Sequence, residues 1–234
     1  MKIGALEAGG TKMVCAIGDE YGRISEQIFV PTTTPDETMP KIIEYFRDKG
    51  IEALGIASFG PVDVNKESPT YGYILKTPKP AWADYNIVGT MKEALGVPIG
   101  FDTDVNGSLL GEVTGGAAKG LTDVVYITVG TGIGGGILSG GRVVHGMLHP
   151  EMGHAIVMLI LTVSPRKVIL GGGVMHQMHL FPMIRRKVAE KLNRYIETGE
   201  LADPENYIVP AGCNDDQGIM GAVKLGLNAL TEAQ

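Results

Sequence analysis

Apolar positions along the chain follow two periods, and each period predicts one kind of element. Short runs of consecutive or alternating apolar residues predict strands, and apolar residues at every third or fourth position predict helices. In the first half, strands are expected at 3–8, 13–17, 23–30, 54–59 and 98–101. Helices are expected among them at 35–49, 87–95 and 106–118.

The second half repeats this order. Its strands are expected at 126–129, 137–139, 142–144, 167–170 and 207–209. Its helices are expected at 155–163, 180–196 and 218–230. Both halves therefore read βββ-α-β-α-β-α, which predicts an α/β protein with a duplicated βββαβα core, two lobes and a cleft between them. We place the lobes at 1–118 and 119–234, with the final helix able to pack on the first lobe.

The densest glycine cluster lies at 126–136, YITVGTGIGGG, where five glycines within seven positions follow a strand. Glycine at this density costs backbone entropy, so it indicates positive φ angles or close approach of the backbone to another group. A glycine turn after a strand also exposes backbone N–H groups without side chains in the way. Such a turn suits a phosphate.

A dinucleotide site is a second interpretation of the same glycines. Gly130, Gly132 and Gly135 fit G-x-G-x-x-G, and Glu151 lies about where a ribose-binding acid is expected. That fingerprint requires a helix to follow, whereas 137–144 reads as a strand, a Gly-Gly turn and another strand. We therefore favour a phosphate-binding hairpin, with a plain glycine-rich hairpin as the third interpretation.

Composition narrows the class of protein. A hydrophobic content of 44% and a charged content of 20% are typical of a globular protein, and the 34 glycines are about twice the usual share. The net charge of −6, without a Lys/Arg cluster, argues against a nucleic-acid partner. The longest apolar run, 155–161, is too short to span a bilayer. Two cysteines make no disulfide framework, and no signal peptide is evident, so we expect a cytoplasmic protein.

Five short motifs resemble those of one family. They are EAGGTK at 7–12, TDVN at 103–106, GTGIGGG at 130–136, HPEMGH at 149–154 and LGGGV at 170–174. Their order resembles the first phosphate, catalytic, second phosphate, sugar and adenosine motifs of ROK sugar kinases. The EAGGTK opening and the loop from Tyr71-Gly72 to Thr77-Pro78-Lys79 are most similar to those of bacterial ROK fructokinases. The resemblance covers nearly the whole chain and implies an actin-like, ribonuclease H-like ATPase core. Glu7 stands where Asp is commoner.

The chain departs from this family directly after the sugar motif. In ROK kinases a segment follows that carries further zinc ligands, mostly cysteines, a further sugar-binding Glu and helices of the second lobe. Here His154 is followed at once by residues that match the helix before the adenosine strand. Either the protein has lost the segment or the printed sequence omits it. The intact motifs favour omission.

The resemblance implies transfer of the ATP γ-phosphoryl group to a hexose hydroxyl, with Mg²⁺ neutralising charge. Asp104, at a strand end facing the cleft, is our expected catalytic base. Its structural alternative is to cap the helix that begins near Asn106. Asp102 lies two residues earlier, where an extended strand would point it to the opposite side, so we leave it out of the site.

The nucleotide site is expected to use both glycine hairpins. Phosphates would be held by backbone N–H groups and hydroxyls of Gly9, Gly10, Thr11, Gly130, Thr131 and Gly132, each of which is otherwise a plain turn residue. Glu7 is expected to reach Mg²⁺ through water, and Lys12 either approaches a phosphate or is simply exposed. The adenine or ribose would lie over Gly171, Gly172 and Gly173, which are otherwise a strand-end turn.

The sugar site is expected to combine segments far apart in the sequence. Its expected residues are Gly60, Pro61, Thr103, Asp104, Glu151 and His154. His154 would also bind a structural zinc ion if its partner ligands exist. His145 and His149 invite a metal-cluster interpretation, which we discount because they lie in a tight hairpin without repeated ligand spacing.

The resemblance favours D-fructose as the substrate and a homodimer as the assembly. A glucose, mannose or N-acetylhexosamine kinase of the same family is the nearest alternative. A sugar-responsive ROK repressor would have an N-terminal helix-turn-helix and a basic face, whereas this chain starts in the first strand. A non-catalytic sugar-binding protein is the remaining alternative, and it gains weight if the segment after His154 is truly absent.

Overall fold

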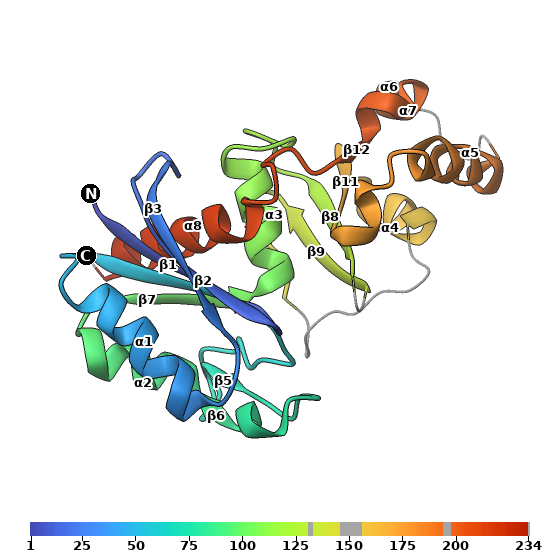
Figure 1. Ribbon diagram of the computed structural model, residues 1–234. Helices are drawn as coiled ribbons and strands as arrows, with labels where there is room; N and C mark the ends of the chain where they lie inside the picture. Colours follow the sequence, from blue (N-terminus) through green and yellow to red (C-terminus); the bar gives the residue numbers. More distant parts are fainter. Residues whose placement is uncertain (131–132, 146–155, 194–197, 234) are drawn as a thin grey trace.

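The computed structural model describes residues 1–130, 133–145, 156–193 and 198–233 (Figure 1). Two five-stranded sheets form its framework. In the first, the order is β3-β2-β1-β4-β7, with β1 antiparallel to β2 and parallel to β4. The strands are β1 (Ile3–Ala8), β2 (Lys12–Gly18), β3 (Ile24–Pro31), β4 (Ala53–Ser58) and β7 (Ile99–Thr103).

The second sheet repeats the first. Its order is β10-β9-β8-β11-β12, with β8 antiparallel to β9 and parallel to β11. In both sheets the strands thus follow the order third, second, first, fourth and fifth along their half of the chain, which confirms the predicted duplication. The strands are β8 (Val124–Val129), β9 (Ile133–Ser139), β10 (Arg142–Val143), β11 (Lys167–Gly171) and β12 (Ile208–Pro210).

Helices cover both faces of the first sheet. On one face, α1 (Pro35–Arg47) and α2 (Ile87–Leu95) pack on β1, β2 and β4 around Leu6, Ile42 and Ile56, all fully buried. Helix α1 begins with a proline and two acidic residues, which favour a helix N-terminus. In α2 the side chain of Asn86 accepts a hydrogen bond from Gly89 N–H and caps the first turn.

Helix α8 (Gln217–Glu232) covers the opposite face of the first sheet, and α3 (Asp104–Thr114) lies between the two sheets (Figure 1). The two helices meet at glycines: a Cβ on Gly221 would overlap the carbonyl oxygen of Gly107. Only glycine permits this approach. Since α3 also packs on β8 and β9, the α3–α8 pair joins the two halves of the molecule.

The second sheet is flanked by α4 (Ile156–Val163) and α5 (Leu180–Leu192), which bury Val125, Leu170 and Phe181. The short helices α6 (Gly199–Ala202) and α7 (Pro204–Tyr207) lead into β12. The part of the chain that the structure describes holds no helix long and apolar enough to cross a membrane.

Several bounds differ from the prediction. The third helix begins at Asp104 instead of Asn106 and ends at Thr114, and α5 ends at Leu192 because Asn193 adopts a left-handed conformation. Residues 63–84, for which the pattern predicts neither a strand nor a helix, contain part of a small hairpin. The elements that the pattern missed are β5 (Tyr73–Ile74), β6 (Tyr85–Asn86), α6, α7 and the 3₁₀ helices η1 (Pro80–Trp82) and η2 (Gly173–His176).

Candidate active site

The carboxyl ends of three neighbouring strands meet at one edge of the first sheet. In the register of β1, β4 and β7, Ala8 pairs with Ser58, and Ser58 pairs with Thr103. The residues that follow these positions are Gly9, Phe59 and Asp104. The first glycine turn, the Gly60–Pro61 turn and Asp104 therefore gather at one edge, the usual location for a ligand in an α/β sheet.

The first glycine turn joins β1 to β2. Gly9 N–H donates to the carbonyl oxygen of Lys12 at 3.1 Å, and the hydroxyl of Thr32 donates to the carbonyl of Gly9 at 2.8 Å. A Cβ on Gly9 would lie 2.6 Å from the Lys12 oxygen, so this turn needs glycine. The Lys12 ammonium lies 4.7 Å from the centroid of the Phe29 ring.

The second glycine turn joins β8 to β9. Gly130 has open space where a side chain would be, while Thr131 and Gly132 lie outside the described residues. Further along β9, a Cβ on Gly134 would lie 2.6 Å from the Val105 side chain, and one on Gly136 would lie 2.9 Å from Asn106 Oδ1. These two glycines of the cluster thus serve close packing of β9 on α3.

Two carboxyl groups near the first glycine turn, those of Glu7 and Asp104, repel each other electrostatically. Burial, followed by the negative charge of Asp104, raises the pKa of Glu7 to about 7, and the charge of Lys12 opposes this shift. A Cβ on Gly218 would lie 2.5 Å from the Glu7 carboxyl, so Glu7 packs against the first turn of α8. The arrangement suits a divalent cation, because such an ion relieves repulsion between carboxylates and prefers oxygen ligands.

Thr103, and not Asp104, caps α3. Thr103 Oγ1 accepts a hydrogen bond from Asn106 N–H at 3.0 Å, and Thr103 is 1% exposed. Asp104 is the first helical residue, and its Oδ1 accepts from Val105 N–H at 2.9 Å. The capping alternative for Asp104 is therefore wrong. The hydroxyl of Thr103, which we had placed in the sugar site, is engaged in the cap.

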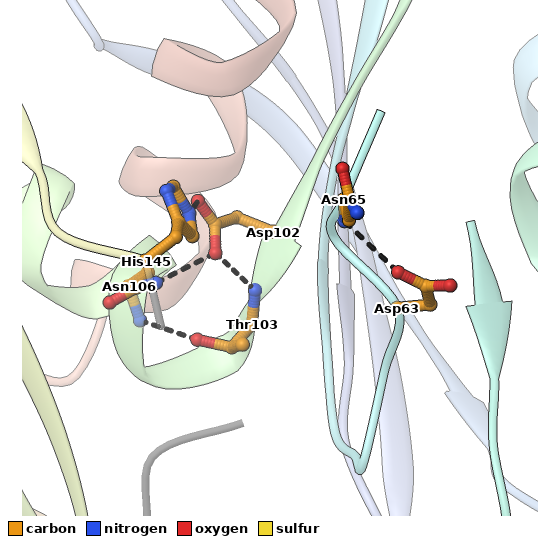
Figure 2. A network of polar contacts seen from close by, with 6 residues as sticks. All are labelled: Asp63, Asn65, Asp102, Thr103, Asn106 and His145. Atoms are coloured by element: carbon orange, nitrogen blue, oxygen red, sulfur yellow. Dashed lines mark hydrogen bonds and ion pairs between the residues drawn. The ribbon is translucent and has the colours of Figure 1, made fainter. Parts of the chain in front are cut away.

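A network of polar contacts joins Asp102, Thr103, Asn106 and His145, and Asp104 lies within the same stretch of sequence (Figure 2). Asp102, which is 4% exposed, contacts the side chains of Asn106 and His145 and the backbone of Thr103. The sequence patterns predicted neither Asp102 nor His145 as a site residue. No local pattern signals this pair, because its members lie 43 positions apart and meet only through the fold.

The expected adenosine turn lines a cavity of about 340 Å³. Gly172 has a φ of 87°, and a Cβ on it would lie 2.6 Å from the carbonyl oxygen of Val129. The same cavity is also lined by four residues that the motifs do not predict, Pro210, Ala211, Asn214 and Asp215. Its described lining is Leu170, Gly171, Gly172, Met175, His176, Met178, Pro210, Ala211, Asn214 and Asp215. The Asn/Asp-rich turn after the last strand was the available signal.

The expected sugar and zinc residues are only partly described. Glu151 and His154 lie outside the described residues, as does His149. Gly60 and Pro61 follow β4 and are joined by a cis peptide bond. Within the described ranges, no group of three or more His, Cys, Asp or Glu side chains is arranged to hold a metal ion. The zinc prediction therefore has no support there.

Comparison with known proteins places this geometry in context. The chain matches the model of the ROK family over residues 3–159 and 155–229. It is 38% identical to a fructokinase of Pediococcus pentosaceus, with 100% of both chains covered. It is 36% identical to a fructokinase of Zymomonas mobilis, with 97% of this chain and 96% of that one covered.

A ROK hexokinase from Thermus thermophilus shares the fold with a TM-score of 0.79 at 21% identity, over 99% of this chain and 100% of that one. The actin-like core implied by the motifs is thereby confirmed. The alignment with the Pediococcus enzyme spans 291 positions, 57 more than the 234 residues of this chain. At least that many of its positions therefore have no residue here.

Proposed function

Because this chain belongs to the ROK family, we propose that it is an ATP-dependent hexose kinase that converts D-fructose to fructose 6-phosphate. The observation that carries the proposal is the register of β1, β4 and β7. It brings the first glycine turn, the Gly60–Pro61 turn and Asp104 to one sheet edge. Phosphoryl transfer to an alcohol needs at least a turn that binds the phosphates and a carboxylate beside it that accepts the proton of the alcohol.

In this proposal Asp104 accepts the proton of the attacking sugar hydroxyl. The fold supports the role because Thr103 takes over the helix cap, so the Asp104 carboxylate is not needed for it. The phosphates lie between the two glycine turns, bound by Gly9, Gly10 and Thr11 on one side and by Gly130, Thr131 and Gly132 on the other. Lys12 adds positive charge beside the first turn.

Glu7, whose carboxyl group is influenced by the charge of Asp104, would hold Mg²⁺ through water. When bound, the ion supplies charge neutralisation for the phosphates. The adenosine would occupy the cavity at Gly171, Gly172 and Gly173. The sugar would be bound by Gly60, Pro61, Glu151 and His154, with Thr103 acting through its helix cap. A structural zinc at His154, a homodimer and a cytoplasmic location belong to the proposal on the resemblance and composition alone.

The segment expected after His154 is part of the same proposal. Two findings support it: the alignment with the Pediococcus enzyme has 57 positions beyond this chain, and the two family matches meet at 155–159. That junction coincides with the point at which the motifs depart from the family pattern.

An ADP-release assay across fructose, glucose, mannose and N-acetylmannosamine tests the proposal. We expect the highest kcat/KM with fructose. A clear preference for another hexose would reassign the substrate within the family. A lack of ADP release with every hexose, at saturating ATP and Mg²⁺, would refute the kinase activity and leave a binding or regulatory protein.

A further inference from the structure

We propose that Asp102 and His145 are positioning residues for phosphoryl transfer: they fix the start of α3, which carries Asp104, and tie it to the segment that follows β10. This inference rests on the proposed kinase function. The motif resemblance assigns neither residue. Figure 2 shows the two side chains pointing toward one another, from β7 and from the segment after β10.

Asp102 makes three hydrogen bonds or ion pairs with its two carboxylate oxygens. Oδ1 accepts from the backbone N–H of Thr103 at 2.8 Å and from Asn106 Nδ2 at 2.7 Å. Oδ2 lies 2.7 Å from His145 Nε2. A carboxylate that is 4% exposed needs such partners, because burial of a charge is costly unless the charge is paired and hydrogen-bonded.

These contacts enclose Asp104 on both sides in the sequence. Thr103 precedes it and caps α3, while Asn106 follows it and donates to both Thr103 Oγ1 and Asp102 Oδ1. Three hydrogen bonds thus hold the stretch from Asp102 to Asn106. The orientation of the proposed base therefore depends on Asp102.

His145 brings the other sheet into this network. It lies two residues beyond β10, whereas Asp102 belongs to β7, so their contact joins the edge strands of the two sheets. Both residues line a cavity of about 860 Å³ whose walls include residues of β7 and β10. Six positions after His145 the chain reaches Glu151, the expected sugar ligand.

Protonation of His145 strengthens the contact. The hydrogen bond to Asp102 is the main cause that raises the pKa of His145, and burial opposes it. The protonated imidazole makes a charge-assisted hydrogen bond, which is shorter and stronger than a neutral one. Removing His145 leaves Asp102 Oδ2 without this partner and releases the segment before the sugar motif from β7.

The test compares His145→Ala, His145→Gln and wild type for fructose and ATP separately. We expect His145→Ala to lower kcat/KM for fructose by about tenfold to a hundredfold, since small misplacements of catalytic groups cost about that much. The KM for ATP should stay unchanged, because neither residue lines the cavity at the expected adenosine turn. His145→Gln, which keeps an N–H donor, should recover most of the activity. His179→Ala, an exposed histidine outside the site, is the matched control.

The same kinetics are measured for Asp102→Asn and for the double variant that combines Asp102→Asn with His145→Ala. If the two residues act as one unit, the double variant loses no more activity than the worse single variant. Unchanged fructose kinetics in His145→Ala would overturn the inference. Equal losses of kcat/KM for fructose and for ATP, together with a lower Tm, would overturn it as well, because they indicate a structural role only. If the wild-type protein phosphorylates no hexose, the proposed function is wrong, and so is this inference.

Discussion

Among single residues, Glu7 is the one through which the geometry of the site most directly makes the stability of the protein depend on pH. Its pKa is raised from 4.5 to about 7, so the folded protein holds a proton that the unfolded chain has already released between these values. The stability that this proton contributes is present below about pH 4.5 and is lost as pH rises through about 7. Above that pH the folded state carries an unfavourable buried charge.

We therefore expect Glu7→Gln to be more stable than wild type at pH 8 without Mg²⁺, by at most about 3 kcal/mol. The difference should shrink towards pH 5, where Glu7 is protonated in the folded protein. Urea unfolding at both pH values measures it, with the exposed Glu44→Gln as control. A stability difference independent of pH would contradict the raised pKa.

Asp104 is the residue whose removal should separate catalysis from stability. Asp104→Asn removes the proposed base, so kcat should fall by about 10²- to 10⁴-fold. The fold should not suffer, because Thr103 caps α3 and the substitution removes a negative charge that repels Glu7. Turnover and Tm are measured on the same preparation. Near-normal turnover would show that another group accepts the proton.

At the scale of elements, Glu112 joins α3 to the turn that follows β12. It is fully buried, and its carboxylate accepts hydrogen bonds from the backbone N–H groups of Ala117, Gly212 and Cys213. We expect Glu112→Gln to lower the free energy of unfolding by about 2–4 kcal/mol, because an amide nitrogen then faces an N–H donor in a buried site.

Urea unfolding measures this change, with the exposed Glu93→Gln on α2 as the control. A difference between Glu112→Gln and wild type below about 0.5 kcal/mol, as for an ordinary surface substitution, would contradict the account of Glu112.

The elements also show what a sequence can and cannot predict. Periodicity and glycine turns located the long strands and helices, because each depends on residues close in sequence. The register of β1, β4 and β7, which places Asp104 near the first turn, comes from the structure and was not predicted. The contact between Asp102 and His145 depends on two sheets meeting. The packing role of Gly134 likewise requires the position of α3, so neither was predictable from local pattern.

At the scale of the whole molecule, the two sheets share one strand order and α3 and α8 join them. The two family matches meet at 155–159. At this junction the motifs of the chain depart from the pattern of the family. If a segment of the protein is missing from the printed sequence there, intact mass spectrometry of the purified protein should give more than 24.8 kDa. A mass of 24.8 kDa would show that the protein lacks it.

The central claim is that this molecule transfers a phosphoryl group from ATP to the 6-hydroxyl of fructose. The most direct measurement couples the product to phosphoglucose isomerase and glucose-6-phosphate dehydrogenase, which report fructose 6-phosphate as NADPH. We predict NADPH formation that requires fructose, ATP and Mg²⁺ together and that is lost in Asp104→Asn. ADP release without NADPH, or no signal under any condition, would contradict the claim.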